Sequence, residues 1–91
     1  MWKFKQSSQF KKDFKRYGHN KSKLESLMNI LSQLRENGKV EAQYGPHMLK
    51  GEYLGCMECH VESDFLLVWI DEECQLIKLV RLGSHSELFG K

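Results

Sequence analysis

Apolar and polar residues follow one period before Gly38 and another after it. Upstream of Gly38, many apolar residues recur every three or four positions, which is the spacing of one helix face. Downstream they fall into short alternating or continuous runs, which are typical of strands. The pattern therefore predicts helices in the N-terminal half and an antiparallel sheet in the C-terminal half.

The first twenty residues predict a short strand followed by a short helix. Trp2 and Phe4 alternate with lysines, as in a strand with one apolar face. The helix is expected to begin at a serine cap, Ser7 or Ser8, and to end at Gly18. Its apolar face consists of three aromatic residues: Phe10, Phe14 and Tyr17.

A second, longer helix is predicted to end at Asn37-Gly38. The segment from Ser22 to Glu25 has the spacing of a capping box and would open this helix. Its apolar stripe consists of Leu24, Leu27, Met28, Leu31 and Leu34. Only a short polar turn separates the two helices, so we expect an antiparallel helical hairpin.

The C-terminal half predicts a three-stranded antiparallel meander and a helical turn. Residues 52–61 resemble a strand, and Phe65–Ile70 is apolar on both faces, as expected of a central strand. "DEEC" is the expected turn before the last strand, Gln75–Leu82. Alternation in that strand places Leu76, Val80 and Leu82 on one face and Ile77, Leu79 and Arg81 on the other. A capping box from Ser84 to Glu87 predicts one helical turn.

Together these elements predict a small α+β domain that spans residues 1–91 as a single unit. No apolar run approaches the roughly 18 residues of a membrane span. The N-terminus lacks the apolar stretch of a signal peptide. We therefore expect a cytoplasmic protein that is not bound to a membrane.

Basic residues are concentrated at the N-terminus, although the net charge is only +2. Residues 1–23 contain eight lysines and arginines against one acid, Asp13. Such a basic end suggests a polyanionic partner, such as nucleic acid or a ribosome, but it also fits a solvated lysine-rich helix face. The candidate contact residues lie on the first helix: Lys11, Lys12, Lys15 and Arg16.

Three cysteines, an odd number, fit reduced thiols better than disulfides. Cys56 and Cys59 have the spacing of a zinc knuckle, which Cys74, His60 or His85 could complete. The predicted strand, however, points residues three apart to opposite faces. We therefore expect no metal and no cofactor, and we interpret the cysteines as small buried apolar residues.

The predicted topology brings three histidines, one carboxylate and one arginine to one edge of the sheet. They are His47, His60, Asp64, Arg81 and His85. Glu58 is expected on the same strand face as His60. Such a set fits metal-free RNA cleavage, which needs a general base for a ribose 2′-hydroxyl, a general acid for the leaving 5′-oxygen and a cation for the phosphate. The residue types alone also fit isolated surface histidines.

Residues 47–90 resemble the C-terminal half of YafQ toxins, within the RelE superfamily of bacterial toxin–antitoxin systems. Three pieces of fixed spacing carry the resemblance: His47-x-Leu49-x-Gly51-x-Tyr53-x-Gly55, His60-Val61-Glu62-x-Asp64-Phe65 and Arg81-x-Gly83-x-His85-x-x-Leu88-Phe89-Gly90. The resemblance implies a RelE-like fold and a ribosome-dependent, metal-independent endoribonuclease that cuts mRNA. It also implies a cognate antitoxin that holds the enzyme inactive.

The resemblance further implies roles for individual residues. His85 is expected to be the general acid, and Asp64 with His60 is expected to act as the base. His47 would orient or assist, so the general base stays open among these last three residues. The groups that would bind substrate are Arg81 and Lys50 for phosphate and Phe89 for stacking on a base.

This chain departs from the family at Met57, where an arginine is expected, at Ser63, where proline is common, and at Phe65, where tryptophan is common. Arg81 is then the only arginine of the C-terminal half, and Lys50 or contacts with ribosomal RNA would have to supply the rest of the substrate binding. Two alternatives remain. One is a non-cleaving ParE-like toxin that acts by binding a protein, and the other is an RNA-binding module.

Overall fold

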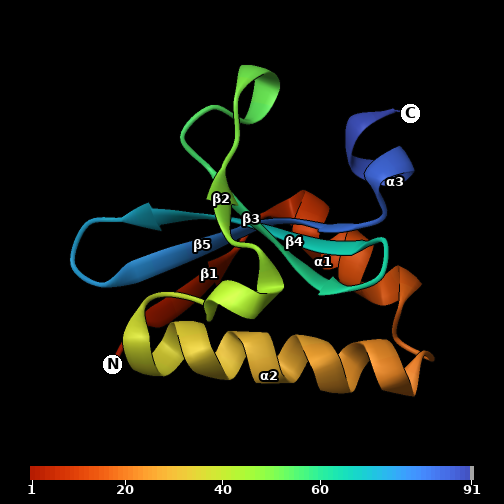
Figure 1. The fold of residues 1–91 in the computed structure, drawn as a ribbon, viewed down its shortest axis with the longest axis horizontal. Helices are drawn as coiled ribbons and strands as arrows, with labels where there is room; N and C mark the ends of the chain where they lie inside the picture. The colour runs from red at the N-terminus through yellow and green to blue at the C-terminus, as the bar shows by residue number, and fades with distance from the viewer. Residues whose placement is uncertain (91) are drawn as a thin grey trace.

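The computed structural model describes residues 1–90 and shows a mixed five-stranded sheet with three α-helices (Figure 1). Its elements are β1 (Lys3–Gln6), α1 (Ser8–Arg16), α2 (Lys21–Asn37), the 3₁₀ turn η1 (Ala42–Tyr44), β2 (His47–Met48), the 3₁₀ turn η2 (Gly51–Tyr53), β3 (Met57–Glu62), β4 (Phe65–Glu72), β5 (Leu76–Gly83) and α3 (His85–Phe89). The strand order is β1-β5-β4-β3-β2, with β1 parallel to β5 and all other neighbours antiparallel. The predicted α+β class and meander are confirmed, and β1 and β2 extend the meander at its two edges.

Of the two predicted caps at the starts of α1 and α2, one is confirmed and one is wrong. Ser7 caps α1, because its hydroxyl accepts a hydrogen bond from the backbone N–H of Phe10 at 2.9 Å. The predicted cap of α2 at Ser22 is wrong: Asn20 caps the helix by accepting from Lys23 N at 3.1 Å. Ser22 instead donates to Glu62 at 3.0 Å, so its hydroxyl links α2 to β3 rather than closing the helix end.

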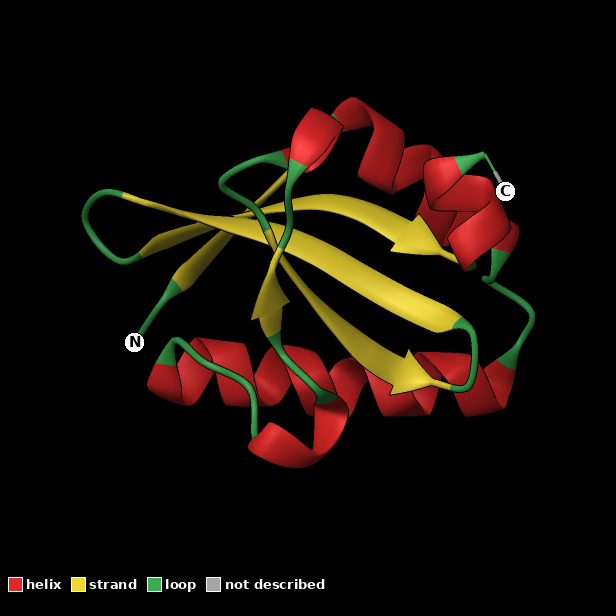
Figure 2. Cartoon of the chain, turned by 45° about the horizontal axis from the view of Figure 1, so that its top comes forward, coloured by secondary structure: helices red, strands yellow, loops and turns green. Residues whose placement is uncertain are grey.

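The two helices pack mainly on the sheet, α1 against β5 and α2 against β3, rather than on each other as in a tight hairpin. Figure 2 shows α2 along one side of the sheet. The buried face of α2 is made by Leu27, Ile30 and Leu34. The predicted stripe therefore missed Ile30 and wrongly included Met28, which is 50% exposed.

The central strand is β4, as predicted, and residues 65–69 are buried on both faces of the sheet. The strand before it is shorter than expected. It begins at Met57 rather than at residue 52, because the segment Gly51–Tyr53 forms the turn η2. The turn after β4 is displaced as well, since β4 continues through Glu72 and the turn covers residues 73–75.

A β-bulge at Val80 overturns the predicted faces of the last strand. Val68 pairs with Arg81 and Trp69 pairs with Leu79, so Val80 is the extra residue. Beyond the bulge the alternation is reversed. Leu82 consequently joins the core on the side of α1 and α2, and Arg81 lies on the opposite face of the sheet.

The sheet separates two apolar clusters of different size. The larger cluster lies under α1 and α2 and includes Cys59, whereas the smaller one consists of Cys56, Leu66, Val68 and Leu88. The expectation that the two cysteines face opposite sides is thus confirmed, and burial raises the pKa of the Cys59 thiol to about 12. Within residues 1–90, no helix is long and apolar enough to cross a membrane.

Candidate active site

His60, Asp64 and His85 come together where the β3–β4 turn meets the start of α3. Oδ1 of Asp64 accepts a hydrogen bond from the backbone N–H of His85 at 2.9 Å and lies 2.8 Å from Nδ1 of its ring. The ring centroids of His60 and His85 are 5.9 Å apart. Asp64 holds its place in a tight turn with a positive φ of 49°, a conformation that aspartate tolerates better than most residues.

The Asp64 carboxylate determines the tautomer of the His85 ring. Hydrogen bonds from the His85 backbone and then from the His85 ring lower the pKa of Asp64. Asp64 is therefore ionised at neutral pH and accepts a hydrogen bond from Nδ1–H of His85. In the neutral ring the other nitrogen, Nε2, then carries no hydrogen. His85 is the first residue of α3, so its backbone N–H and its ring both reach the same carboxylate.

His47 lies beside this group and is held by Glu58, an acid for which the sequence suggested no role. Nε2 of His47 is 3.2 Å from Oε1 of Glu58, and Nδ1 is 2.8 Å from the carbonyl oxygen of Gly45. Glu58 is only 3% exposed, and its Oε2 has no hydrogen-bond partner among residues 1–90. Gly45 also adjoins His60, since a Cβ at Gly45 would lie 3.3 Å from that ring.

Arg81 is bound within the protein rather than free at the surface. Its Nε donates to Oδ2 of Asp13 at 2.8 Å, and Nη1 donates to the hydroxyl of Tyr53 at 2.9 Å. Nη2 reaches Oδ1 of Asp13 at 3.4 Å and the carbonyl oxygen of Glu87 at 3.5 Å. The predicted phosphate-binding arginine therefore lies near α3, but most of its N–H groups donate to partners within the protein.

Asp13 is fully buried and was missed by sequence reasoning. Burial alone would raise the pKa of its carboxyl, but hydrogen bonds from Arg81 and the Leu82 backbone outweigh burial and lower it. One signal was available: Asp13 lies three positions after Phe10 and four before Tyr17, on the apolar face of a helix whose other charged residues are all basic.

The remaining predicted residues lie around this centre. Phe89 is half-buried, with its ring centroid 6.2 Å from that of His85 and 5.8 Å from that of Tyr53. Lys50 is exposed in the loop before η2. The exposed basic residues of α1 are Lys11, Lys12, Lys15 and Arg16. Among them, Arg16 forms an ion pair with Glu87 of α3 at 2.9 Å.

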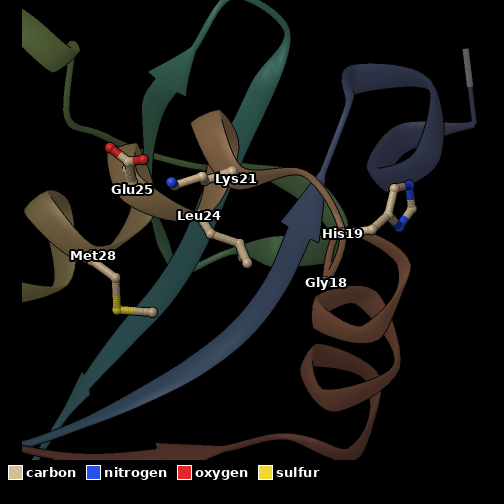
Figure 3. A pocket seen from close by; sticks show the side chains of 6 residues that line it. All are labelled: Gly18, His19, Lys21, Leu24, Glu25 and Met28. Atoms are coloured by element: carbon tan, nitrogen blue, oxygen red, sulfur yellow. The ribbon is translucent and has the colours of Figure 1, made fainter.

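The histidine group is an open surface site rather than a deep pocket. A hollow of about 520 Å³ lies elsewhere, along α2 and the connection that precedes it (Figure 3). Its lining residues are Gly18, His19, Lys21, Leu24, Glu25 and Met28. Within the described part of the chain, no group of three or more histidine, cysteine, aspartate or glutamate side chains is arranged to hold a metal ion.

Comparison with known proteins identifies the family. Residues 2–90 match the family described as "Bacterial toxin of type II toxin-antitoxin system, YafQ". The chain belongs to the YafQ family of bacterial toxins. It is 32% identical over 87 residues to the mRNA interferase toxin YafQ of Escherichia coli K12, and the match covers 92% of this chain and 91% of that protein. The resemblance seen in the C-terminal half is confirmed and extends through the N-terminal half.

Solved structures agree with this YafQ assignment. YafQ from E. coli BL21(DE3) has a TM-score of 0.85 at 27% identity, covering 99% of this chain and 100% of that one. A metal-bound toxin from Helicobacter pylori has a TM-score of 0.84 at 37% identity and covers 98% and 100%. The E. coli DinJ–YafQ complex has a TM-score of 0.83 at 28% identity, with 99% and 100% covered. The expected RelE-like toxin fold is therefore confirmed.

Proposed function

We propose that this YafQ-family protein is a ribosome-dependent endoribonuclease that cuts mRNA and is neutralised by a cognate antitoxin. The observation that carries the proposal is the convergence of His60, Asp64 and His85, which supplies two proton-transfer groups and a carboxylate that orients one of them. The relatives support it, because one is named an mRNA interferase and another is a YafQ in complex with DinJ.

In the proposed reaction His85 is the general acid. Its Nδ1–H is held by Asp64, so Nε2 can point a second hydrogen at the leaving 5′-oxygen when the ring is protonated. The carboxylate stabilises that imidazolium, as a paired acid does for a catalytic histidine elsewhere. Asp64 is thus better placed to orient His85 than to act as the base itself.

The general base is His60, which faces His85 across a gap of 5.9 Å between ring centroids. It takes the proton of the 2′-hydroxyl, whose oxygen attacks the adjacent phosphorus while the bond to the 5′-oxygen breaks. Both ring nitrogens of His47 already face acceptors, the Gly45 carbonyl and Glu58, so His47 shapes the site rather than exchanging a proton. The whole reaction uses protein side chains and requires no metal or cofactor.

Binding of the substrate uses groups around this centre. Phe89 offers a half-exposed ring beside His85 on which a base stacks. Because two of the four hydrogen bonds of Arg81 go to Asp13, Lys50 supplies part of the positive charge for the phosphate, and contacts of the mRNA with the ribosome help to hold the substrate. In this proposal the toxin acts at cytoplasmic ribosomes, and the exposed lysines of α1 contact phosphates of ribosomal RNA.

The test is cleavage of mRNA on purified ribosomes by the parent and by His85→Ala. We expect the variant to lose about a hundredfold or more of the cleavage rate, as is usual for loss of a general acid. His19→Ala is the matched control, because His19 is an exposed histidine outside the cluster, and it should cleave at the parental rate. Equal rates for His85→Ala and the parent would refute the assignment. Toxicity of the parent without any RNA cleavage would favour a non-cleaving ParE-like toxin.

A further inference from the structure

The helix α3 carries two residues of the proposed site but has only five residues, His85–Phe89. An isolated helix of this length is not stable in water, because the cost of forming its first turn is not recovered. Its position must therefore be set by contacts with the rest of the protein. These contacts hold both ends of α3, and they lead to α1.

The C-terminal end of α3 is held through its free carbonyl groups, which have no partner within the helix. Nη2 of Arg81 lies 3.5 Å from the carbonyl oxygen of Glu87, and the hydroxyl of Tyr53 lies 3.4 Å from that of Leu88. Each bond is long, but Arg81 and Tyr53 are also joined to each other at 2.9 Å. The two side chains thus form one support beneath the last turn.

The orientation of that support depends on Asp13. Its side chain is 0% exposed and accepts from the Arg81 Nε at 2.8 Å and from the Leu82 backbone at 3.0 Å. The side-chain amide of Gln9 also donates to Oδ1 of Asp13, at 3.1 Å. Four hydrogen bonds in all fix the guanidinium plane of Arg81, and two of them go to Asp13. Without this carboxylate the guanidinium would lose its only charged partner among residues 1–90, in a site where the Arg81 side chain is 16% exposed.

The N-terminal end of α3 contacts α1 through a second, separate set of hydrogen bonds. Glu87 closes a capping box with Ser84 and also accepts hydrogen bonds from Arg16 and Tyr17. Both of these donors belong to the C-terminal end of α1. The surface pair with Arg16 is half-exposed and contributes little, so the buried route through Asp13 is the more rigid one.

We propose that Asp13 is a positioning residue for the cleavage reaction: through Arg81 and Tyr53 it holds α3, and with it His85, in register with Asp64 and His60. The inference rests on the proposed nuclease function. Its physical basis is that catalysis depends steeply on the placement of reacting groups, so a small displacement of a five-residue helix lowers the rate without removing a reacting group. Asp13 itself touches no substrate.

The test compares Asp13→Asn with the parent, because asparagine keeps the shape and one acceptor oxygen but loses the charge that orients Arg81. We expect kcat for ribosomal mRNA cleavage to fall about tenfold with KM within about twofold of the parent. Amide hydrogen exchange measured by NMR should become faster in α3 and remain unchanged in β4. Gln9→Ala is the matched control, since it removes a different partner of Asp13, and it should leave both readouts at parental values.

Other outcomes overturn the inference. An unchanged kcat, or a lowered kcat with parental exchange in α3, would mean that Asp13 does not act by holding this helix. Should Asp13→Asn fail to fold, Tyr53→Phe decides, because it removes only the hydroxyl that joins Arg81 to Leu88. That variant should show faster exchange in α3 and a kcat lowered about threefold. If the parent protein does not cleave mRNA, the nuclease proposal is refuted. The anchoring of α3 is tested separately, because it is refuted if the amides of α3 exchange in Asp13→Asn as slowly as in the parent.

Discussion

At the scale of single residues, carboxylates orient the basic side chains of the proposed site. Asp64 holds the ring of His85, Glu58 holds His47 and Asp13 holds Arg81. The sequence indicated the first of these acids by its place in a motif. It placed Asp13 on the apolar face of its helix but could not indicate the partner, because Asp13 and Arg81 are 68 positions apart and only the folded sheet brings them together.

The orienting role of Asp64 leads to a prediction for Asp64→Asn. The amide can still accept from the His85 backbone but cannot stabilise a protonated ring, so cleavage should fall about tenfold or more while the fold is kept. Single-turnover cleavage rates across the neutral pH range measure the effect. Ser63→Ala, at the exposed neighbouring position of the same turn, should match the parent. Parental cleavage by Asp64→Asn would show that the Asp64–His85 pair does not contribute to the reaction.

At the scale of elements, regular patterns were predictable and single-residue irregularities were not. The central strand and the capping box of α3 followed directly from the sequence, since each depends on neighbouring residues. The bulge at Val80 has no local signal, because one extra residue leaves an apolar run looking equally regular. Yet this bulge turns Arg81 toward α3, so the site could not be placed correctly by alternation alone.

The start of α2 gives a test at this scale. Asn20 accepts a hydrogen bond from Lys23 N, whereas Ser22 donates to a carboxylate on another element. Asn20→Ala should therefore lower the free energy of unfolding by about 1 kcal/mol, and Ser22→Ala by less than about 0.5 kcal/mol. Urea denaturation of both variants measures the difference. The reverse order would restore the capping box that the sequence suggested.

At the scale of the whole molecule, carboxylates join elements that are distant in sequence. Four of them have a pKa below the ordinary value: Asp13, Glu62, Asp64 and Glu87. Asp13 links α1 to β5, Glu62 links β3 to α2, and Glu87 links α3 to α1. Asp64, in the turn between β3 and β4, binds the first residue of α3, so the four acids together connect the sheet to all three helices.

Acid should loosen these connections together. A carboxylate with a lowered pKa stabilises the fold above its unfolded pKa of about 4, and this stabilisation is lost as pH falls through the folded value. The free energy of unfolding should thus be nearly constant near neutral pH and fall steadily below about pH 4.5. Asp13→Asn should flatten that decline. Urea titrations from neutral pH to about pH 3 provide the measurement, and equal slopes for parent and variant would contradict it.

The parallel pairing of β1 with β5 determines when the fold can be completed during translation. The hydroxyl of Ser7 donates to the carbonyl of Val80, a contact that spans 73 positions, and β1 finds its register only on residues 76–79. A nascent chain emerges from its N-terminus, so β1 and α1 leave the exit tunnel long before their partner strand is made. Contacts this distant in sequence form late. The helix bearing His85 is synthesised later still, so the proposed nuclease site is not assembled until synthesis has passed that helix.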